Sequence, residues 1–117
     1  MTVAVAVTDS AEGIAALASA HAEARLRGSG LLIANLRLNP LDDAEIPRDV
    51  DVKVVEREPG VEVGDHVLRL LDDHRDEVEL LVIGMKRRSP VGKLILGSLT
   101  QELLLSADVP VLAVKVA

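Results

Sequence analysis

The chain has 117 residues, of which 49% are hydrophobic, and it contains no Cys, Phe, Trp or Tyr. That length suits one domain, residues 1–117, whose aliphatic core needs no disulfide or metal. The composition excludes thiolate metal sites, cysteine nucleophiles and the aromatic platforms on which single-stranded nucleic acids stack. The net charge of −6 argues against general binding to nucleic acid or to anionic membranes.

The charged residues are unevenly distributed. Residues 41–80 are strongly acidic, whereas residues 81–100 contain no acid. The bases in that second window are Lys86, Arg87, Arg88 and Lys93. A purely basic window in an acidic protein indicates either an anion site or a solvated loop that keeps the chain soluble, and charge alone does not separate the two.

No segment of the sequence is typical of export or membrane insertion. The N-terminal apolar run Val3–Val7 is too short for the core of a signal peptide and lacks a basic flank. No apolar stretch approaches the roughly 20 residues that cross a bilayer. We therefore expect a cytoplasmic protein with no membrane partner.

The chain begins with a predicted strand and a long helix. The continuous apolar run Val3–Val7 is typical of a strand buried on both faces. Asp9-Ser10-Ala11-Glu12 resembles a helix N-cap followed by a glutamate, and Gly28-Ser29-Gly30 ends the helix. The apolar stripe that predicts its buried face consists of Ile14, Leu17, Ala18, His21 and Arg25.

Residues 31–36 predict the second strand, and residues 50–55 predict the third. The segment from Leu38 to Asp49 is polar and carries Pro40 and Pro47, so a full crossover helix hardly fits there. We expect at most a helical turn near residues 41–45. An amphipathic helix follows. Its apolar face consists of Val63, Val67, Leu70, Leu71 and His74.

Residues 80–83 predict a fourth buried strand that ends at Gly84, just before the basic window. Ser98-Leu99-Thr100-Gln101 then matches the S-x-x-Q capping box, which predicts a helix that starts at Ser98 and ends near Ala107. Residues 111–116 predict the last strand.

Strands that alternate with helices predict an α/β fold with an open parallel five-stranded sheet and helices on both faces. Right-handed connections allow the strand order 3-2-1-4-5, which has a switch point between strands 1 and 4. Ligands of such Rossmann-like sheets bind beside that point, at the carboxyl ends of the strands. Here those ends are Thr8-Asp9-Ser10 and the segment after Gly84, so this position favours an anion site over a merely solubilising loop.

The common catalytic and nucleotide-binding motifs are absent. A Walker A loop ending at Gly92-Lys93 would need glycine at Arg87 and Ser or Thr at Leu94. There is no G-x-G-x-x-G and no G-x-S-x-G, and no nucleophile–base pair is apparent. We therefore expect no catalytic residue. Slow nucleotide hydrolysis, with Asp9 as the only candidate base, is the least supported alternative.

One arrangement suited to phosphate remains. Gly84 lacks a Cβ and can bring the backbone close to a ligand. Gly97 and the first amides of the following helix present free N–H groups at the positive end of a helix dipole. The Ser98 hydroxyl either donates to a phosphate or caps this helix.

These residues, written Gly84-x2-Arg87-x9-Gly97-Ser98, resemble the signature of the universal stress protein family: Gly, two residues, Gly, nine residues and Gly-Ser or Gly-Thr. The tail GSLTQELLLSADVPVLAVK and the opening VAVAVTDSAEG also resemble this family. The resemblance covers nearly the whole chain. It implies one universal stress protein domain over residues 1–117, with the fold of the adenine nucleotide alpha hydrolase-like proteins.

The resemblance further implies binding of an adenine nucleotide such as ATP or AMP, without a metal site, by a regulator in the stress response. Thr8 and Asp9 would approach the adenine and ribose, and Leu36 would cover the base. Ile83 and Gly84 would line the base and sugar. The residues that would surround the phosphates are Arg87, Gly97, Ser98 and Leu99.

The sequence departs from the family pattern in two places. Arg87 replaces the middle glycine, and it either supplies a guanidinium to a phosphate or fills the pocket. Its neighbours Lys86 and Arg88 either contact phosphate or only keep the loop soluble. The connection between the second and third strands lacks a helix that is usual in the family, which would open one side of the adenine pocket.

The remaining polar residues have simpler structural explanations. His21, His66 and His74 have no metal-ligand spacing and are better explained as helix-face residues. Asp72-Asp73 and Asp76-Glu77 are better explained as a solvated helix end than as a metal cluster.

The last strand, residues 111–116, would form a sheet edge, and a bare apolar edge favours pairing with another chain. The family resemblance also implies homodimers through this strand; the alternative is a monomer edge protected by Lys115. If the site binds no nucleotide, the chain would instead be a homodimeric interaction module of the same fold.

Overall fold

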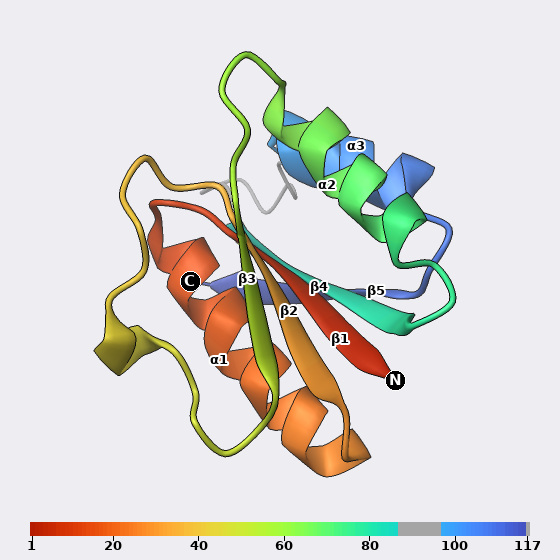
Figure 1. The fold of residues 1–117 in the computed structure, drawn as a ribbon. Coiled ribbons are helices and arrows are strands. Elements are labelled where there is room, and N and C mark those ends of the chain that lie inside the picture. The colour runs from red at the N-terminus through yellow and green to blue at the C-terminus, as the bar shows by residue number, and fades with distance from the viewer. Residues whose placement is uncertain (87–96, 117) are drawn as a thin grey trace.

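The computed structural model describes residues 1–86 and 97–116, which form an α/β fold around one five-stranded parallel sheet (Figure 1). The strands lie side by side in the order β3-β2-β1-β4-β5, and every neighbouring pair is parallel. The predicted strand order is therefore confirmed. The strands are β1 (Thr2–Val7), β2 (Gly30–Asn35), β3 (Val52–Glu56), β4 (Val78–Lys86) and β5 (Val111–Val116).

Helices cover both faces of this sheet, as predicted. Helix α1 (Ala11–Arg27) lies on one face, and α2 (Val63–Asp73) and α3 (Ser98–Ser106) lie on the other (Figure 1). In β1, Val3, Val5 and Val7 belong to the core on the α1 face, while Ala4 and Ala6 belong to the core on the α2–α3 face. Burial on both faces explains why the inner strands are continuous apolar runs without polar alternation.

The buried face of α1 differs from the predicted stripe. The residues that it buries are Gly13, Ala16, Leu17, Ala20 and Ala24. Ile14 is 66% exposed, so its assignment to the buried face was wrong. Small side chains allow a helix to approach a sheet closely, and that close packing places this alanine-rich face inward although Ile14 is more hydrophobic.

The two ends of α1 follow their local sequence signals. Ser10 is the N-cap, and its side chain accepts a hydrogen bond from the Gly13 amide. Gly28 ends the helix with a left-handed φ of 64°, a conformation that glycine adopts at little cost.

The start of α3 differs from the predicted capping box. Gly97 is the N-cap, and Ser98 is already the first helical residue. The Gly97 carbonyl accepts the Gln101 amide at 3.0 Å, which closes the first turn. The predicted start of the helix at Ser98 is therefore confirmed. Of the two roles considered for the Ser98 hydroxyl, capping is not the one seen, because Gly97 occupies the cap position and no side chain of the described residues caps this helix.

The connection from β2 to β3 contains a 3-10 turn, η1 (Asp43–Glu45), and no α-helix, as its polar, proline-containing sequence predicted. Leu41 is buried in the core on the α1 face, and Ile46 and Val50 pack against the same core. The connection thus covers part of the sheet beside α1. Among the described residues, no helix is both long enough and apolar enough to cross a membrane.

Candidate functional site

The predicted site residues lie at the carboxyl edge of the sheet, around the switch point between β1 and β4. Thr8 and Asp9 follow β1, Leu36 follows β2, and Lys86 is the last residue of β4. Gly97, Ser98 and Leu99 form the start of α3, at the end of the connection from β4. Arg87 and Arg88 lie outside the described residues.

The turn after β1 is held by local hydrogen bonds and by close backbone packing. The Thr8 and Ser10 hydroxyls lie 2.8 Å apart and share a hydrogen bond, and Ser10 also caps α1. A Cβ added at Gly13 would come closer than 3.0 Å to backbone atoms of Thr8. This turn is therefore fixed against α1, while the Asp9 side chain remains 59% exposed.

Asp9 faces an arginine that the sequence analysis did not single out. The Nε of Arg37 lies 3.4 Å from Asp9 Oδ1, and its Nη1 donates to Glu45 Oε2 at 2.7 Å. The hydrogen bond to Glu45 raises the pKa of Arg37. The Asp42 amide, and after it Arg37, lowers the pKa of Glu45. Arg37 lies two residues after the end of β2, at this edge, and that position was the signal that could have found it.

Gly84 has a packing role that the sequence did not predict. It lies inside β4, which continues to Lys86, and it is paired with Val114 of β5. A Cβ at this position would come closer than 3.0 Å to the Glu12 carbonyl in the first turn of α1. On that side, the missing Cβ of Gly84 therefore allows a helix, and not a ligand, to approach closely. Its own carbonyl accepts a hydrogen bond of 3.4 Å from the Thr100 hydroxyl.

The residues predicted to contact a base are largely buried. Leu36 is 6% exposed and Ile83 is 3% exposed, and both belong to the core on the α2–α3 face. The Leu36 carbonyl accepts a hydrogen bond from Arg57 at 3.2 Å, which links the ends of β2 and β3. These side chains offer only a small apolar surface to a base at this edge.

The start of α3 is the part of the edge best suited to an anion. Within the described part of the chain, a Cβ built at Gly97 would meet no atom within 4 Å. Gly97 and Ser98 are exposed, and so is Lys86 at the end of β4. Backbone N–H groups in the first turn of a helix, together with the helix dipole, favour phosphate.

The histidines take part in packing and surface contacts. His21 Nε2 lies 2.6 Å from Asp49 Oδ1, and His74 Nδ1 lies 3.0 Å from the Leu70 carbonyl. His66 is buried on α2, and its Nε2 has no hydrogen-bond partner in the part of the chain that the structure describes. Among residues 1–86 and 97–116, no group of three or more potential metal ligands comes together.

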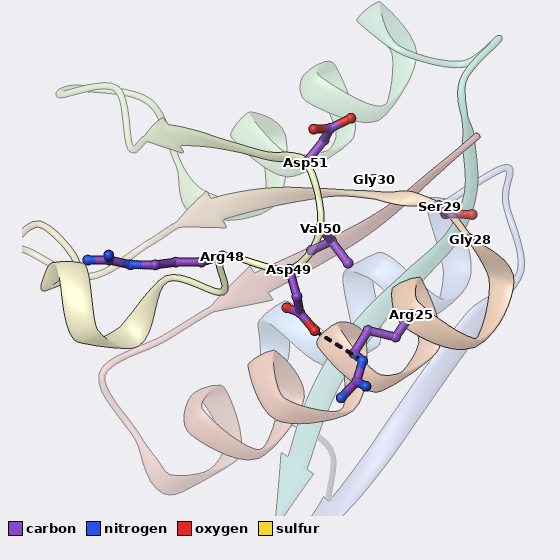
Figure 2. Close-up of a pocket in the computed structure, with 8 residues that line it drawn as sticks. All are labelled: Arg25, Gly28, Ser29, Gly30, Arg48, Asp49, Val50 and Asp51. Carbon is purple, nitrogen blue, oxygen red and sulfur yellow. Dashed lines mark ion pairs between the residues drawn. The ribbon is translucent and has the colours of Figure 1, made fainter.

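A pocket of about 600 Å³ lies at the opposite, amino edge of the sheet (Figure 2). Its main polar contact is the ion pair of 3.0 Å between Arg25 and Asp49. Arg48 and Asp51 extend in different directions from the chain (Figure 2). Because its polar groups do not converge, this pocket is a weaker candidate than the carboxyl edge.

Comparison with known proteins decides the family. The model of the universal stress protein family matches residues 40–115. The chain belongs to this family. A universal stress protein from Mycolicibacterium smegmatis is 40% identical to it, in an alignment that covers 88% of each chain. The family identified from the glycine motif and the tail is thus confirmed.

Solved structures of universal stress proteins share the fold. One from Archaeoglobus fulgidus has a TM-score of 0.74, 27% identity and 98% coverage of both chains. An A. fulgidus structure in complex with dAMP has a TM-score of 0.69 and 22% identity, with 98% of both chains covered. A universal stress protein in complex with cAMP has a TM-score of 0.66 and 23% identity over 97% of this chain and 95% of that one.

Proposed function

We propose that the chain is an adenine-nucleotide-binding regulator in the stress response, and that it binds a nucleotide of the ATP or AMP type. The observation that carries this proposal is the convergence of Asp9, Lys86 and the start of α3 at one switch point. Structural relatives solved in complex with dAMP and cAMP support the proposal. The regulatory role itself rests on membership of the family.

The phosphates would lie at the start of α3. The amides of Gly97, Ser98 and Leu99 would donate to them, and the Ser98 hydroxyl is available for this because the cap position belongs to Gly97. Lys86 would add a positive charge, together with Arg87 and Arg88. Such contacts to charged oxygens are stronger than neutral hydrogen bonds.

The base and sugar would lie at the carboxyl edge of the sheet, between Leu36, Ile83 and the end of β1. Thr8 and Asp9 supply polar groups there, and Leu36 and Ile83 supply a narrow apolar surface. Gly84 would contribute by allowing α1 to pack rather than by lining the sugar. Because no aromatic ring is available for stacking, we expect the phosphate contacts to carry most of the affinity.

Isothermal titration calorimetry with ATP, AMP, cAMP and adenosine tests this proposal. Ser98→Ala should weaken ATP binding several-fold. Ser106→Ala, the matched change at the other end of α3, should leave it unchanged, because the helix C-terminus has no donors for phosphate. A lack of binding at millimolar ligand would reject nucleotide binding.

In that case the chain would be an interaction module of the same fold, with Arg87 filling the phosphate site. Arg87→Gly separates the two functions. If Arg87→Gly gains nucleotide binding, Arg87 blocks the site and the interaction module is supported. If Arg87→Gly loses binding, Arg87 holds the phosphate.

We also propose that the chain forms homodimers through β5, which is a terminal strand of the sheet. Its residues are intermediate or exposed, with Leu112 37% exposed, and an apolar edge of this kind is stabilised by pairing. Sedimentation velocity should give the mass of a dimer at micromolar concentration. A monomer mass at all concentrations would contradict this pairing.

A further inference from the structure

Arg37 is a positive charge held between two acids at the edge where we propose that the nucleotide binds. Its Nη1 donates to Glu45 at 2.7 Å, and its Nε lies 3.4 Å from the Asp9 carboxylate. The side chain is only 19% exposed, although Arg37 lies in the connection two residues after the end of β2. The side chain is therefore held in place by its contacts within the fold and is largely shielded from solvent.

The two acids hold Arg37 unequally. The Arg37 Nε is buried and has no hydrogen-bond partner among the described residues, so its contact with Asp9 is electrostatic without hydrogen-bond geometry. Glu45 is firmly placed, because its Oε1 accepts the Asp42 amide at 3.0 Å. Arg37 can therefore stay in position on Glu45 when the exposed Asp9 carboxylate turns toward a ligand.

Arg37 also borders open space. Arg37 and Arg57 both line a pocket of about 480 Å³ at the ends of β2 and β3. Among the described residues, Arg37 is the ion-pair partner of both Asp9 and Glu45, so its removal would leave two negative charges without that partner beside a polyanionic ligand. Like charges within a Debye length repel, and the repulsion grows with each charge on the ligand.

We infer that Arg37 is a specificity-determining residue that sets the preference of the site for phosphorylated over unphosphorylated adenine compounds. This inference rests on the proposed function. The role of Arg37 differs from direct phosphate binding at α3, because Arg37 neutralises the charge of Asp9 and Glu45 on the other side of the site. Removing Arg37 should therefore lower the affinity more for ligands that carry more negative charge.

The experiment is calorimetry with adenosine, AMP and ATP at low ionic strength. Arg37→Met keeps the apolar part of the side chain and should weaken ATP binding by about tenfold. AMP binding should weaken by a smaller factor, and adenosine binding by less than about twofold. Arg37→Lys should restore most of the preference for ATP. Arg25→Met is the matched control, because Arg25 pairs with Asp49 at the opposite edge of the sheet.

A second variant keeps the test independent of how well Arg37→Met folds. Glu45→Gln removes one of the two acids and should raise the ratio of ATP to adenosine affinity several-fold. Arg37→Met combined with Glu45→Gln should recover part of the ATP affinity that Arg37→Met loses.

The outcomes separate this inference from the proposed function. If the wild-type chain binds no nucleotide, the proposed function fails and this inference fails with it. If the wild type binds but Arg37→Met and Glu45→Gln leave the ATP to adenosine ratio unchanged, only the inference fails. Equal losses for adenosine and ATP, or the same graded loss in Arg25→Met, would also overturn it.

Discussion

The α-carbon of Gly84 packs directly against the backbone carbonyl of Glu12, in the first turn of α1. Gly13, the next residue of that turn, has an equally close contact with the backbone of Thr8. Two glycines, one in the helix and one in β4, thus let α1 begin close to the switch point. The motif glycine at position 84 therefore has a packing role whether or not a ligand binds.

We predict that Gly84→Ala destabilises the fold by about 3 kcal/mol, because neither β4 nor the Glu12 carbonyl can move without disturbing other elements. Urea unfolding followed by far-ultraviolet circular dichroism measures the change. Gly64→Ala is the matched control: its Cβ would contact the flexible Glu102 carboxylate, and alanine favours a helix by about 1 kcal/mol over glycine. Similar losses for the two variants would contradict this explanation.

Ser10 and Ser98 provide a second comparison. Ser10 caps α1, so Ser10→Ala should lower the free energy of unfolding by about 1 kcal/mol. Ser98 is not the cap of α3, so Ser98→Ala should change stability by less than about 0.5 kcal/mol. A loss for Ser98→Ala as large as that for Ser10→Ala would show that the hydroxyl has a capping role after all.

The stability of the fold should decrease toward acidic pH through Asp49 and Glu45. The hydrogen bond from His21 lowers the pKa of Asp49, and the Asp42 amide and Arg37 lower the pKa of Glu45. A carboxylate whose pKa is lower in the folded chain than in the unfolded chain stabilises the fold at pH values above its unfolded-state pKa. This contribution is lost as the pH falls through the pKa of the folded state. Below the usual carboxyl range of about 4, the wild type should therefore lose stability faster than Asp49→Asn or Glu45→Gln. Parallel pH curves for all three proteins, from thermal unfolding, would refute this assignment.

The affinity for ATP should depend strongly on salt. If the start of α3, Lys86 and the basic window carry the binding, raising the ionic strength screens these charges and weakens ATP binding, while adenosine binding changes little. Equilibrium dialysis from low to physiological salt measures both. A salt-independent ATP affinity would place the binding energy in base and sugar contacts instead.

The sequence predicted the sheet well because its signals are local. Runs such as Val3–Val7 are short and apolar at every position, a pattern typical of strands buried on both faces. The polar connection after β2, with Pro40 and Pro47, likewise left little room for a helix. Together with the right-handed connections of parallel strands, these local signals predicted the strand order and the edge at which the site lies.

The details that the sequence did not predict depend on contacts between distant elements. The inward face of α1 is set by close packing of alanines on the sheet, which a hydrophobicity pattern undervalues beside Ile14. Gly84 contacts Glu12, and Arg37 contacts Asp9, across large separations in sequence. No pattern within a single segment predicts such pairs.

Both cores are built from aliphatic side chains, and the chain contains no aromatic residue. The folded protein therefore absorbs very little light at the wavelengths where adenine absorbs strongly. The ultraviolet spectrum of a freshly purified sample thus becomes a direct measure of any nucleotide that it carries, with almost no protein background to subtract. Protein concentration must then be taken from peptide-bond absorbance or amino-acid analysis, since a dye-free reading in the usual aromatic band would report the ligand alone.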